Sequence, residues 1–295
     1  MRAVGRAWWI VSPFIITAIW SGLSQAGFER RYAGSRSLAT AGAISPFSED
    51  AWAFYANPAR AARIDEAGVF YVPDLFGVPE INSTGVAWRG QLFGFNCGSA
   101  FQTFGYDYYR ESTLSVNLSA PVERSLFLGT NFNLNHLSIR DYGTDLDLSI
   151  DAGARMFLSD EFSVSFCMTN LNSATMTISR DRLPQTLAAG IGYQSEILYA
   201  GVVYFKELGF PASMRIGAEY SPLKFLTLRV GSESGSNAIN TGFALRFMAF
   251  TVEYGVSFHS VLGTTQSFGV SVRFHDVFRS EFEKILEYRK SLRNE

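Results

Sequence analysis

Residues 213–231, SMRIGAEYSPLKFLTLRVG, decide the fold, because apolar and polar residues alternate through both halves of the stretch. Between Met214 and Tyr220 every second residue is apolar, and Arg215 and Glu219 occupy positions in between. Successive side chains of a strand point to opposite faces of a sheet. The stretch therefore predicts two antiparallel strands joined by a short turn, each with one apolar face and one polar face.

The same alternation runs from Ala67 to Phe274 and predicts about 14 strands. Tight joints are expected at 89–90, 159–160, 194–195, 222–223 and 247–248, and longer loops at 73–82, 102–110, 139–144 and 171–184. Short turns at one end and longer loops at the other are typical of transmembrane barrels. A soluble sandwich also alternates, but apolar faces that end in aromatic residues favour contact with lipid. We expect an all-β chain: a single transmembrane antiparallel β-barrel over residues 66–275.

Residues 1–26 have the three parts of a signal peptide. Arg2 and Arg6 precede an apolar core that ends near Trp20, and a small-x-small cleavage motif ends at Ala26. The core is short for crossing a bilayer, although a single membrane anchor is the alternative. We expect cleavage after Ala26, export, and a place in the outer membrane of a Gram-negative-type cell, with outer-membrane lipid as a partner.

Residues 27–65 precede the first strand and include a segment unlike the strands, 34–62, GSRSLATAGAISPFSEDAWAFYANPARAA. Trp52, Phe54 and Tyr55 are too apolar to leave in water, yet the segment is too short to form a core of its own. The barrel interior is the nearest surface that can bury them. We expect a plug, or hatch, with Trp52 inside the barrel, although the stretch is equally typical of an ordinary helix start.

Capping signals predict two short helical turns within this segment. Ser48 is expected to cap the first, with Glu49 and Asp50 in its first turn. Asn57 is expected to cap the second, with Pro58 at its first helical position.

Charged residues recur on the polar faces of the strands, which would face the barrel interior. A narrow barrel pairs such charges so that no ion is buried alone, and a charged constriction that selects solutes is the alternative. Hatch residues Arg60 and Arg63 are expected to meet inward carboxylates such as Glu219 or Glu253. The expected lumen charges are Asp147, Asp151, Arg155, Arg215, Glu219, Arg229, Arg246, Glu253 and Arg273.

Residues 276–295 continue past the last strand and predict a short amphipathic helix on the periplasmic side. Ser280 and Glu283 have the spacing of a capping box. The expected apolar face consists of Phe278, Phe282, Ile285 and Leu286. A frayed end and a helix docked to the barrel rim or to a partner are both compatible with this pattern.

Patterns for catalysis, cofactors and metals are not found. The net charge is −2 and the basic residues are scattered, so nucleic acid is not an expected partner. Cys97 and Cys167 are far apart and predict neither a zinc site nor a disulfide framework. His136, His259 and His275 lack the spacing of metal ligands. We expect no enzymatic activity, no cofactor and no metal.

Three stretches carry a family resemblance: the hatch signature from Ser-Arg-Ser-Leu at 35–38 to Glu-Asp-Ala-Trp-Ala-Phe-Tyr-Ala-Asn-Pro-Ala at 49–59, LPQTLAAGIGY at 183–193, and HSVLGTTQSFGVSVRF at 259–274. They resemble the PorV/PorQ-type branch of the FadL-like outer-membrane β-barrels, from about residue 34 to residue 274. Arg60 and Ala61 stand where that signature usually has Gly and Leu. The hatch turn is therefore expected to differ in detail.

The resemblance implies two different functions. The FadL-like side implies a non-enzymatic, porin-like conduit that is plugged by the hatch and transports small molecules, hydrophobic ones above all. The PorV/PorQ side implies an outer-membrane component or scaffold of a type IX-like protein secretion system, with secretion-system proteins as partners. The sequence leaves both open.

Overall fold

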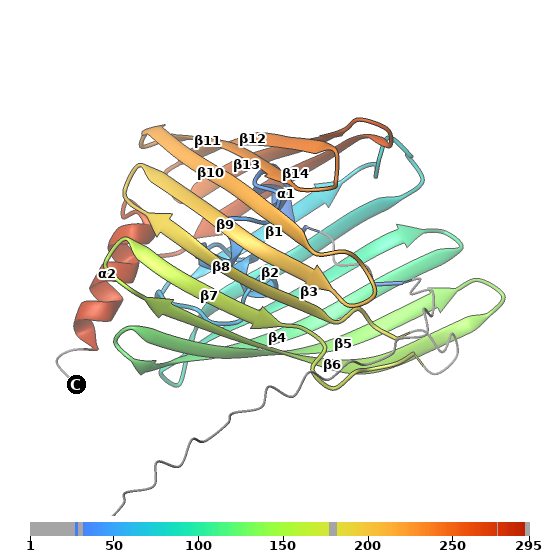
Figure 1. Cartoon of the computed structure of the whole chain (residues 1–295), viewed down its shortest axis with the longest axis horizontal. Coiled ribbons are helices and arrows are strands. Elements are labelled where there is room, and N and C mark those ends of the chain that lie inside the picture. Colours follow the sequence, from blue (N-terminus) through green and yellow to red (C-terminus); the bar gives the residue numbers. More distant parts are fainter. Residues whose placement is uncertain (1–26, 29–31, 177–181, 276, 293–295) are drawn as a thin grey trace, which may run out of the picture.

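The computed structural model describes residues 27–28, 32–176, 182–275 and 277–292, and the predicted signal peptide lies outside this part of the chain. The strands form a closed antiparallel barrel of 14 strands in which sequence neighbours pair and β1 meets β14, which confirms the predicted fold (Figure 1). The strands are β1 (Glu66–Val72), β2 (Asn82–Leu92), β3 (Phe95–Tyr106), β4 (Tyr109–Glu123), β5 (Leu126–Ile139), β6 (Gly143–Phe157), β7 (Phe162–Met168), β8 (Thr186–Gln194), β9 (Leu198–Glu207), β10 (Ser213–Leu223), β11 (Leu226–Glu233), β12 (Ala238–Phe247), β13 (Phe250–His259) and β14 (Gly263–Arg273).

The alternating apolar and polar residues of the sequence correspond to the outer and inner faces of the barrel wall. Ile216 of β10 and Val252 of β13 point outward and are 58% and 51% exposed. Their neighbours on the opposite face, such as Glu219, are buried inside the barrel. Glu219 lies directly across the β10–β11 ladder from Arg229, so the register brings opposite charges together on the inner face.

The two ends of the barrel differ, and we call them the short-turn end and the loop end. The short-turn end carries brief connections such as 93–94 and 224–225, and the loop end carries the connections 73–81 and 169–185. The predicted joint at 89–90 was wrong, because β2 continues to Leu92. The predicted loop at 102–110 was also wrong. There the strands continue to Tyr106 and Tyr109, whose rings stack across a two-residue turn.

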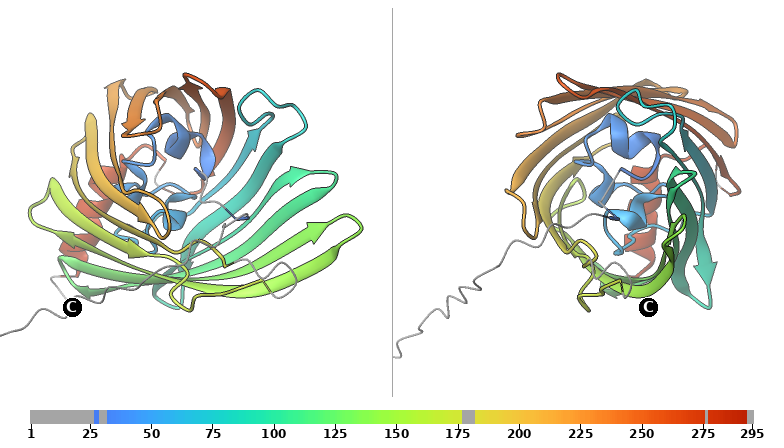
Figure 2. Two further views of the ribbon diagram at one scale, coloured as in Figure 1. Left: turned by 45° about the vertical axis from the view of Figure 1, so that its right-hand side comes forward. Right: turned by 90° about the vertical axis from the view of Figure 1, so that its right-hand side faces the viewer.

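Helical elements are few and short. Inside the barrel lie α1 (Gly34–Ala39), η1 (Ser45–Phe47) and η2 (Ala53–Tyr55), and α2 (Glu281–Ser291) crosses the short-turn end (Figure 2). The Ser280–Glu283 capping box at the start of α2 is formed, as predicted. No helix in the described ranges is long and apolar enough to cross a membrane.

Candidate functional site

The hatch, defined here as residues 32–65, lies inside the barrel (Figure 2). Its helical turns have at most six residues, too few to be stable in water without tertiary contacts. Ala41 and Ala43 have no exposed surface, although they lie outside regular secondary structure. The barrel wall therefore supplies the contacts that hold this segment in one conformation.

The helical turns expected in the hatch are not the ones that form. Ser48 does not cap a helix: it follows η1, and its hydroxyl donates to the Ser45 carbonyl. No helix begins at Pro58 either. Instead the Asn57 side-chain oxygen accepts from Ala59 N at 2.9 Å, which makes a local turn of the kind that competes with helix formation.

The Asn57-Pro58 turn sits against two inward-facing glycines of neighbouring strands. A Cβ at Gly129 would collide with the Pro58 carbonyl, and a Cβ at Gly153 would collide with the Asn57 side chain. The Asn57 amide also donates to Ser165 Oγ at 2.7 Å. This part of the hatch is therefore fixed by backbone approach at glycine and by hydrogen bonds to β6 and β7.

The hatch aromatics lie inside the barrel. Trp52 is 7% exposed and Phe54 is fully buried, while Tyr55 is partly exposed. Trp52 packs edge-on against Phe70 of β1, with ring centroids 4.7 Å apart. Each ring removes a large apolar area from water, so these residues tie the hatch to the β1 side of the wall.

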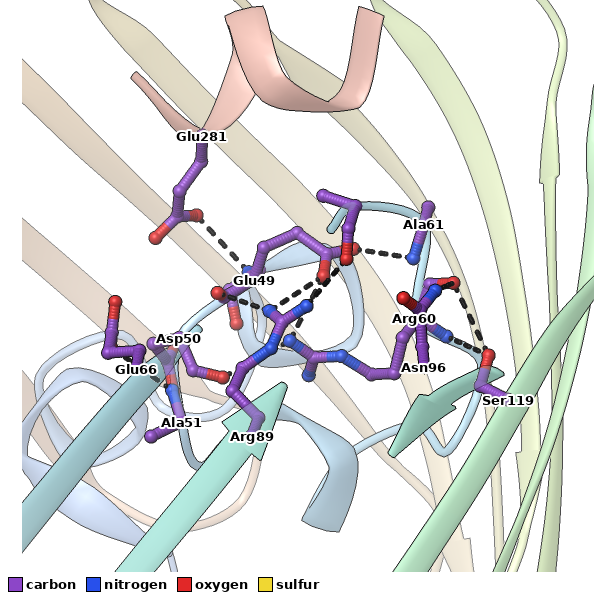
Figure 3. Close-up of polar contacts among 12 residues, drawn as sticks. Glu49, Asp50, Ala51, Arg60, Ala61, Glu66, Arg89, Asn96, Ser119 and Glu281 are labelled. Carbon is purple, nitrogen blue, oxygen red and sulfur yellow. Dashed lines mark hydrogen bonds and ion pairs between the residues drawn. The ribbon is translucent and has the colours of Figure 1, made fainter. Parts of the chain in front are cut away.

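Glu49 is the centre of a buried ion cluster between the hatch and the wall (Figure 3). Its carboxylate has no exposed surface and meets three guanidinium groups: Arg60 at 3.0 Å, Arg89 at 2.9 Å and Arg155 at 3.2 Å. It also accepts from Ala61 N at 2.9 Å. One carboxylate thus joins two parts of the hatch to β2 and β6.

A second ion cluster is built around Arg36 of α1. Its guanidinium donates to both Glu219 oxygens at 2.6 Å, a bidentate geometry, and to Asp50 at 3.1 Å. The prediction that Arg60 and Arg63 meet Glu219 or Glu253 was wrong. Arg60 pairs with Glu49, and Arg63 lies over the Tyr288 ring.

The two carboxylates named in that prediction have other partners. Arg36 and Arg229 pair with Glu219, and Arg229 also pairs with Glu253 at 2.7 Å. The physical reason is reach. Helix α1 packs against β13 and its Arg36 reaches Glu219 of β10, whereas Arg60 contacts Ser119 of β4 and shares Glu49 with Arg89 of β2.

Helix α2 joins the Arg36 cluster from the short-turn end. Glu281 accepts from Arg36 at 2.8 Å and from the backbone N–H of Glu49 at 3.1 Å. Burial alone would raise the pKa of this carboxyl, but Arg36 and Arg273 outweigh it and hold the pKa of Glu281 well below its ordinary value of 4.5. Glu281 is therefore a carboxylate at neutral pH.

The predicted apolar face of the tail was only partly right. Ile285 is fully buried, but Phe278 is 86% exposed. The face that docks includes Tyr288, which packs with Ile285 against a cluster of hatch and wall residues that includes Ile64 and Phe127. The reason for the difference is that Phe278 precedes the helix, so helical periodicity does not place it.

The remaining predicted lumen charges all lie on inward faces but have different surroundings. Arg215 pairs with Glu233 at 3.1 Å, and Arg273 pairs with Glu66 at 2.9 Å. The Asp151 carboxylate is buried and accepts from the amides of Asn131 and Asn133 and from Asn170 N. Asp147 is half-buried near the loop end, and Arg246 is half-buried near the short-turn end.

Two cavities lie on either side of the hatch. The outer cavity, of about 180 Å³, lies toward the loop end, where Trp52, Phe70 and Asn133 contribute to its wall. The inner cavity, of about 500 Å³, lies toward the short-turn end between α2 and strands β9 to β14. Among the residues described by the structure, Asp50 is the one that lines both. The Asp50–Arg36 pair therefore stands where the two cavities come nearest.

Sequence reasoning missed the residues at the centres of the two ion clusters. Glu49 was expected only in the first turn of a helix, Arg36 only within the hatch signature and Arg89 only at a tight joint, and Glu66 and Glu281 were not singled out. A signal existed for Arg89 and Glu66, because both occupy polar positions of alternating strands near the short-turn end. Glu281 had no comparable signal, since charged residues are ordinary on a short exposed helix.

The described residues contain no group of His, Cys, Asp and Glu arranged to hold a metal ion. His259 shapes a turn, with Nδ1 accepting from the N–H groups of Val261 and Leu262. Cys97 and Cys167 are buried and are not joined to each other by a disulfide. The chemistry of this interior is thus hydrogen bonding, ion pairing and packing.

No protein-family profile and no curated protein matches the chain. Solved structures share its fold at low sequence identity. A Pseudomonas aeruginosa FadL homologue has a TM-score of 0.57 and 13% identity over 86% of this chain and 100% of its own. The Pseudomonas putida toluene transporter TodX has a TM-score of 0.55 and 12% identity, over 83% and 98%. The Ralstonia pickettii toluene transporter TbuX has a TM-score of 0.55 and 14% identity, over 82% and 98%. The shared feature is the closed barrel.

Proposed function

We propose that the protein is an outer-membrane conduit for small, largely apolar molecules, closed by its hatch in the conformation described here. The observation that carries the proposal is the placement of the hatch. It separates an outer from an inner cavity inside a closed barrel. Space on both sides of the hatch is what a plug across a conduit requires.

The membrane location is supported by the outer surface of the barrel. Side chains such as Ile216, Val230 and Val252 are more than half exposed, and they belong to a continuous set of outward apolar residues on many strands. In water so large an apolar surface would drive association. In a lipid bilayer the same surface is satisfied, and the closed barrel leaves no strand edge unpaired.

The lining of the outer cavity supports a small, ring-sized solute. Trp52 and Phe70 contribute aromatic surface, while Asn133, Asn135 and Ser149 contribute amide and hydroxyl groups. An apolar cavity of about 150 Å³ is large enough for benzene, so this cavity of about 180 Å³ suits one small ring with room for a polar substituent. The transport of toluene by TodX and TbuX, as their names state, is compatible with that size class.

The resemblance to the PorV/PorQ branch also implied a secretion scaffold, and that role stays a prediction from sequence. Nothing observed in the described residues favours it over a conduit. Catalysis has no support either, since the ion pairs described above join the hatch to the wall or one strand of the wall to another. The predicted signal peptide, residues 1–26, would deliver the chain to the membrane in either case.

The proposal is tested with the double variant Trp52→Ala/Tyr55→Ala in the full-length protein. Removing both rings takes apolar anchorage from the hatch, so we expect higher ion conductance in planar bilayers and faster uptake of toluene by cells that produce the variant. Barrel assembly, monitored by faster migration of the unheated protein on gels, should be retained. Unchanged conductance and uptake in an assembled variant would show that the hatch does not gate a path. Failure to assemble would show that it is a folding element.

A further inference from the structure

The contact between α2 and the hatch has a consequence for how the barrel opens. Glu281 reaches Arg36 and the Glu49 backbone in the first half of the hatch, while Ile285 and Tyr288 cover Ile64 and its neighbours in the second half. One short helix thus touches both halves of a segment that is otherwise attached only to the barrel wall.

The charge balance of the interior depends on the same helix. The buried ion pairs around the hatch join Arg36, Arg60, Arg89, Arg155, Arg229 and Arg273 to Glu49, Asp50, Glu66, Glu219, Glu253 and Glu281. Among the described residues this set comprises six guanidinium groups and six carboxylates, and α2 supplies one of the carboxylates. The Arg215–Glu233 pair of the wall adds one of each sign and leaves the balance unchanged. If α2 leaves, the remaining set has one uncompensated positive charge in a region where unpaired charges are costly.

Arg36, which loses the Glu281 carboxylate when α2 leaves, lies at the boundary between the two cavities. Arg36 is oriented by Glu219 on one side and by Glu281 on another, and in this orientation it reaches Asp50 at 3.1 Å. Asp50 lines both cavities, while Glu281 and Arg36 line the inner one. The position of α2 is therefore coupled to the side chains that separate outer from inner space.

We propose that α2 is an inner latch: Glu281 holds Arg36 against Asp50, and undocking of α2 from the short-turn end releases the hatch and connects the two cavities. The inference rests on the proposed conduit function for its meaning, but the physical coupling between α2 and the hatch stands by itself. The latch faces the side opposite to the outer cavity, so it places control of opening at the short-turn end.

The rest of the α2 contact area explains why the latch can be closed at rest and still be released. Arg289 donates to backbone carbonyls of the rim, at Ser159 and Arg124, and pairs with Asp160, whose side chain is 61% exposed. The pair with Asp160 contributes little because Asp160 is exposed. The binding of α2 comes from Glu281, Ile285 and Tyr288, together with the buried Arg289 guanidinium, which lies over the Phe157 ring at 4.2 Å. These contacts belong to one short helix, so a single undocking step would break them together.

The test compares Glu281→Gln and Ile285→Glu with the control Glu287→Gln, which removes a carboxylate from the exposed side of the same helix. Amide hydrogen exchange is measured for hatch peptides within 34–62 in the assembled barrel. Both latch variants should speed hatch exchange by roughly tenfold or more, because a buried charge-assisted hydrogen bond or a core contact is lost. The control should match the wild type, and exchange in the strands should stay unchanged.

Conductance of the same proteins separates the latch from the conduit. Faster hatch exchange together with higher conductance supports both proposals. Faster hatch exchange without conductance, in the latch variants and in a hatch-deleted barrel alike, would support the latch and refute the conduit. Hatch exchange that stays at the wild-type rate in Glu281→Gln and in Ile285→Glu, with both barrels assembled, would overturn the latch.

Discussion

Replacing Glu49 by Gln is the sharpest perturbation of the hatch, because this one carboxylate faces Arg60, Arg89 and Arg155 with no exposed surface. Gln keeps the size of the side chain and one acceptor oxygen. It removes the negative charge and turns a donor toward guanidinium groups that can only donate. The change is therefore almost purely electrostatic.

The size of the effect on hatch docking depends on which hydrogen-bond acceptors the three arginines retain after the change. Arg89 retains the Ala62 carbonyl at 2.7 Å, and Arg155 retains the side-chain oxygen of Gln194. Neutral acceptors do not replace the lost charge, and removal of one partner from a buried pair costs about 3–5 kcal/mol. We expect hatch docking to weaken by about that amount, which is a factor of roughly 10² to 10⁴ in the docking equilibrium.

Native-state hydrogen exchange measures this directly, since the amides of 34–62 exchange through undocking of the hatch. In Glu49→Gln these amides should exchange faster by roughly the factor given above, while amides of the barrel strands keep their protection. A second variant, Glu49→Gln/Arg60→Gln, should recover part of the loss. It removes one of the guanidinium groups that the first change leaves without a counter-charge.

Hatch exchange at the wild-type rate in Glu49→Gln would refute this role of the Glu49 carboxylate. A double variant that loses the sum of the two single effects would refute it too, because residues in one ion cluster should couple. The surface change Glu287→Gln serves as the control for loss of a single carboxylate.

Two further predictions concern the wall and the latch. Val252 points outward, so Val252→Arg should impair assembly by about 2–4 kcal/mol if the residue lies near the bilayer midplane. Thr251 is one position away and lines the inner cavity, so Thr251→Arg should assemble. Equal loss of the heat-sensitive gel mobility in both variants would contradict the assignment of faces. Because the pKa of Glu281 is depressed in the folded protein, the contribution of Glu281 to docking of α2 is complete above the ordinary glutamate pKa and is lost progressively as the pH falls below it. A spin label at Glu287→Cys should therefore become more mobile in acid. A label whose mobility is independent of pH, or which becomes mobile as the pH rises, would contradict this direction of the pH dependence.

The barrel could be predicted from sequence because its determinant is local. Ile216 and Glu219 lie on opposite faces for the simple reason that strand side chains alternate, and the same rule holds for every strand. The errors came at the ends of strands, because the alternation does not show where a strand stops. The turn near 89–90 was therefore placed too early, and the loop at 102–110 was predicted too long.

The interior could not be predicted in the same way, because its contacts join residues far apart in the chain. Arg36 meets Glu219 and Glu281 across sequence separations of 183 and 245 residues. Local sequence signals predicted that Ser48 caps one helical turn and that Asn57 caps a second one that begins at Pro58. Tertiary contacts with Gly153 and Ser165 decided the conformation instead. The bulk of Trp52 indicated that this segment is buried, but composition does not show which charges meet.

If the hatch is the gate of the proposed conduit, ion pairs at its centre have a physical advantage over apolar contacts. A buried cluster such as that of Glu49 gains little stability over a well-packed apolar one, since desolvation offsets the attraction. The two differ when the hatch moves. An apolar seal would expose hydrophobic surface to the water of the cavities at about 25 cal/mol per Å², whereas Arg36, Asp50 and Glu281 regain hydration as they separate. In the proposed conduit, ion pairs would thus hold the closed position by geometry and lower the free-energy difference to an open one. Apolar contacts accompany the ion pairs, at Trp52 against Phe70 and at Ile285 against Ile64.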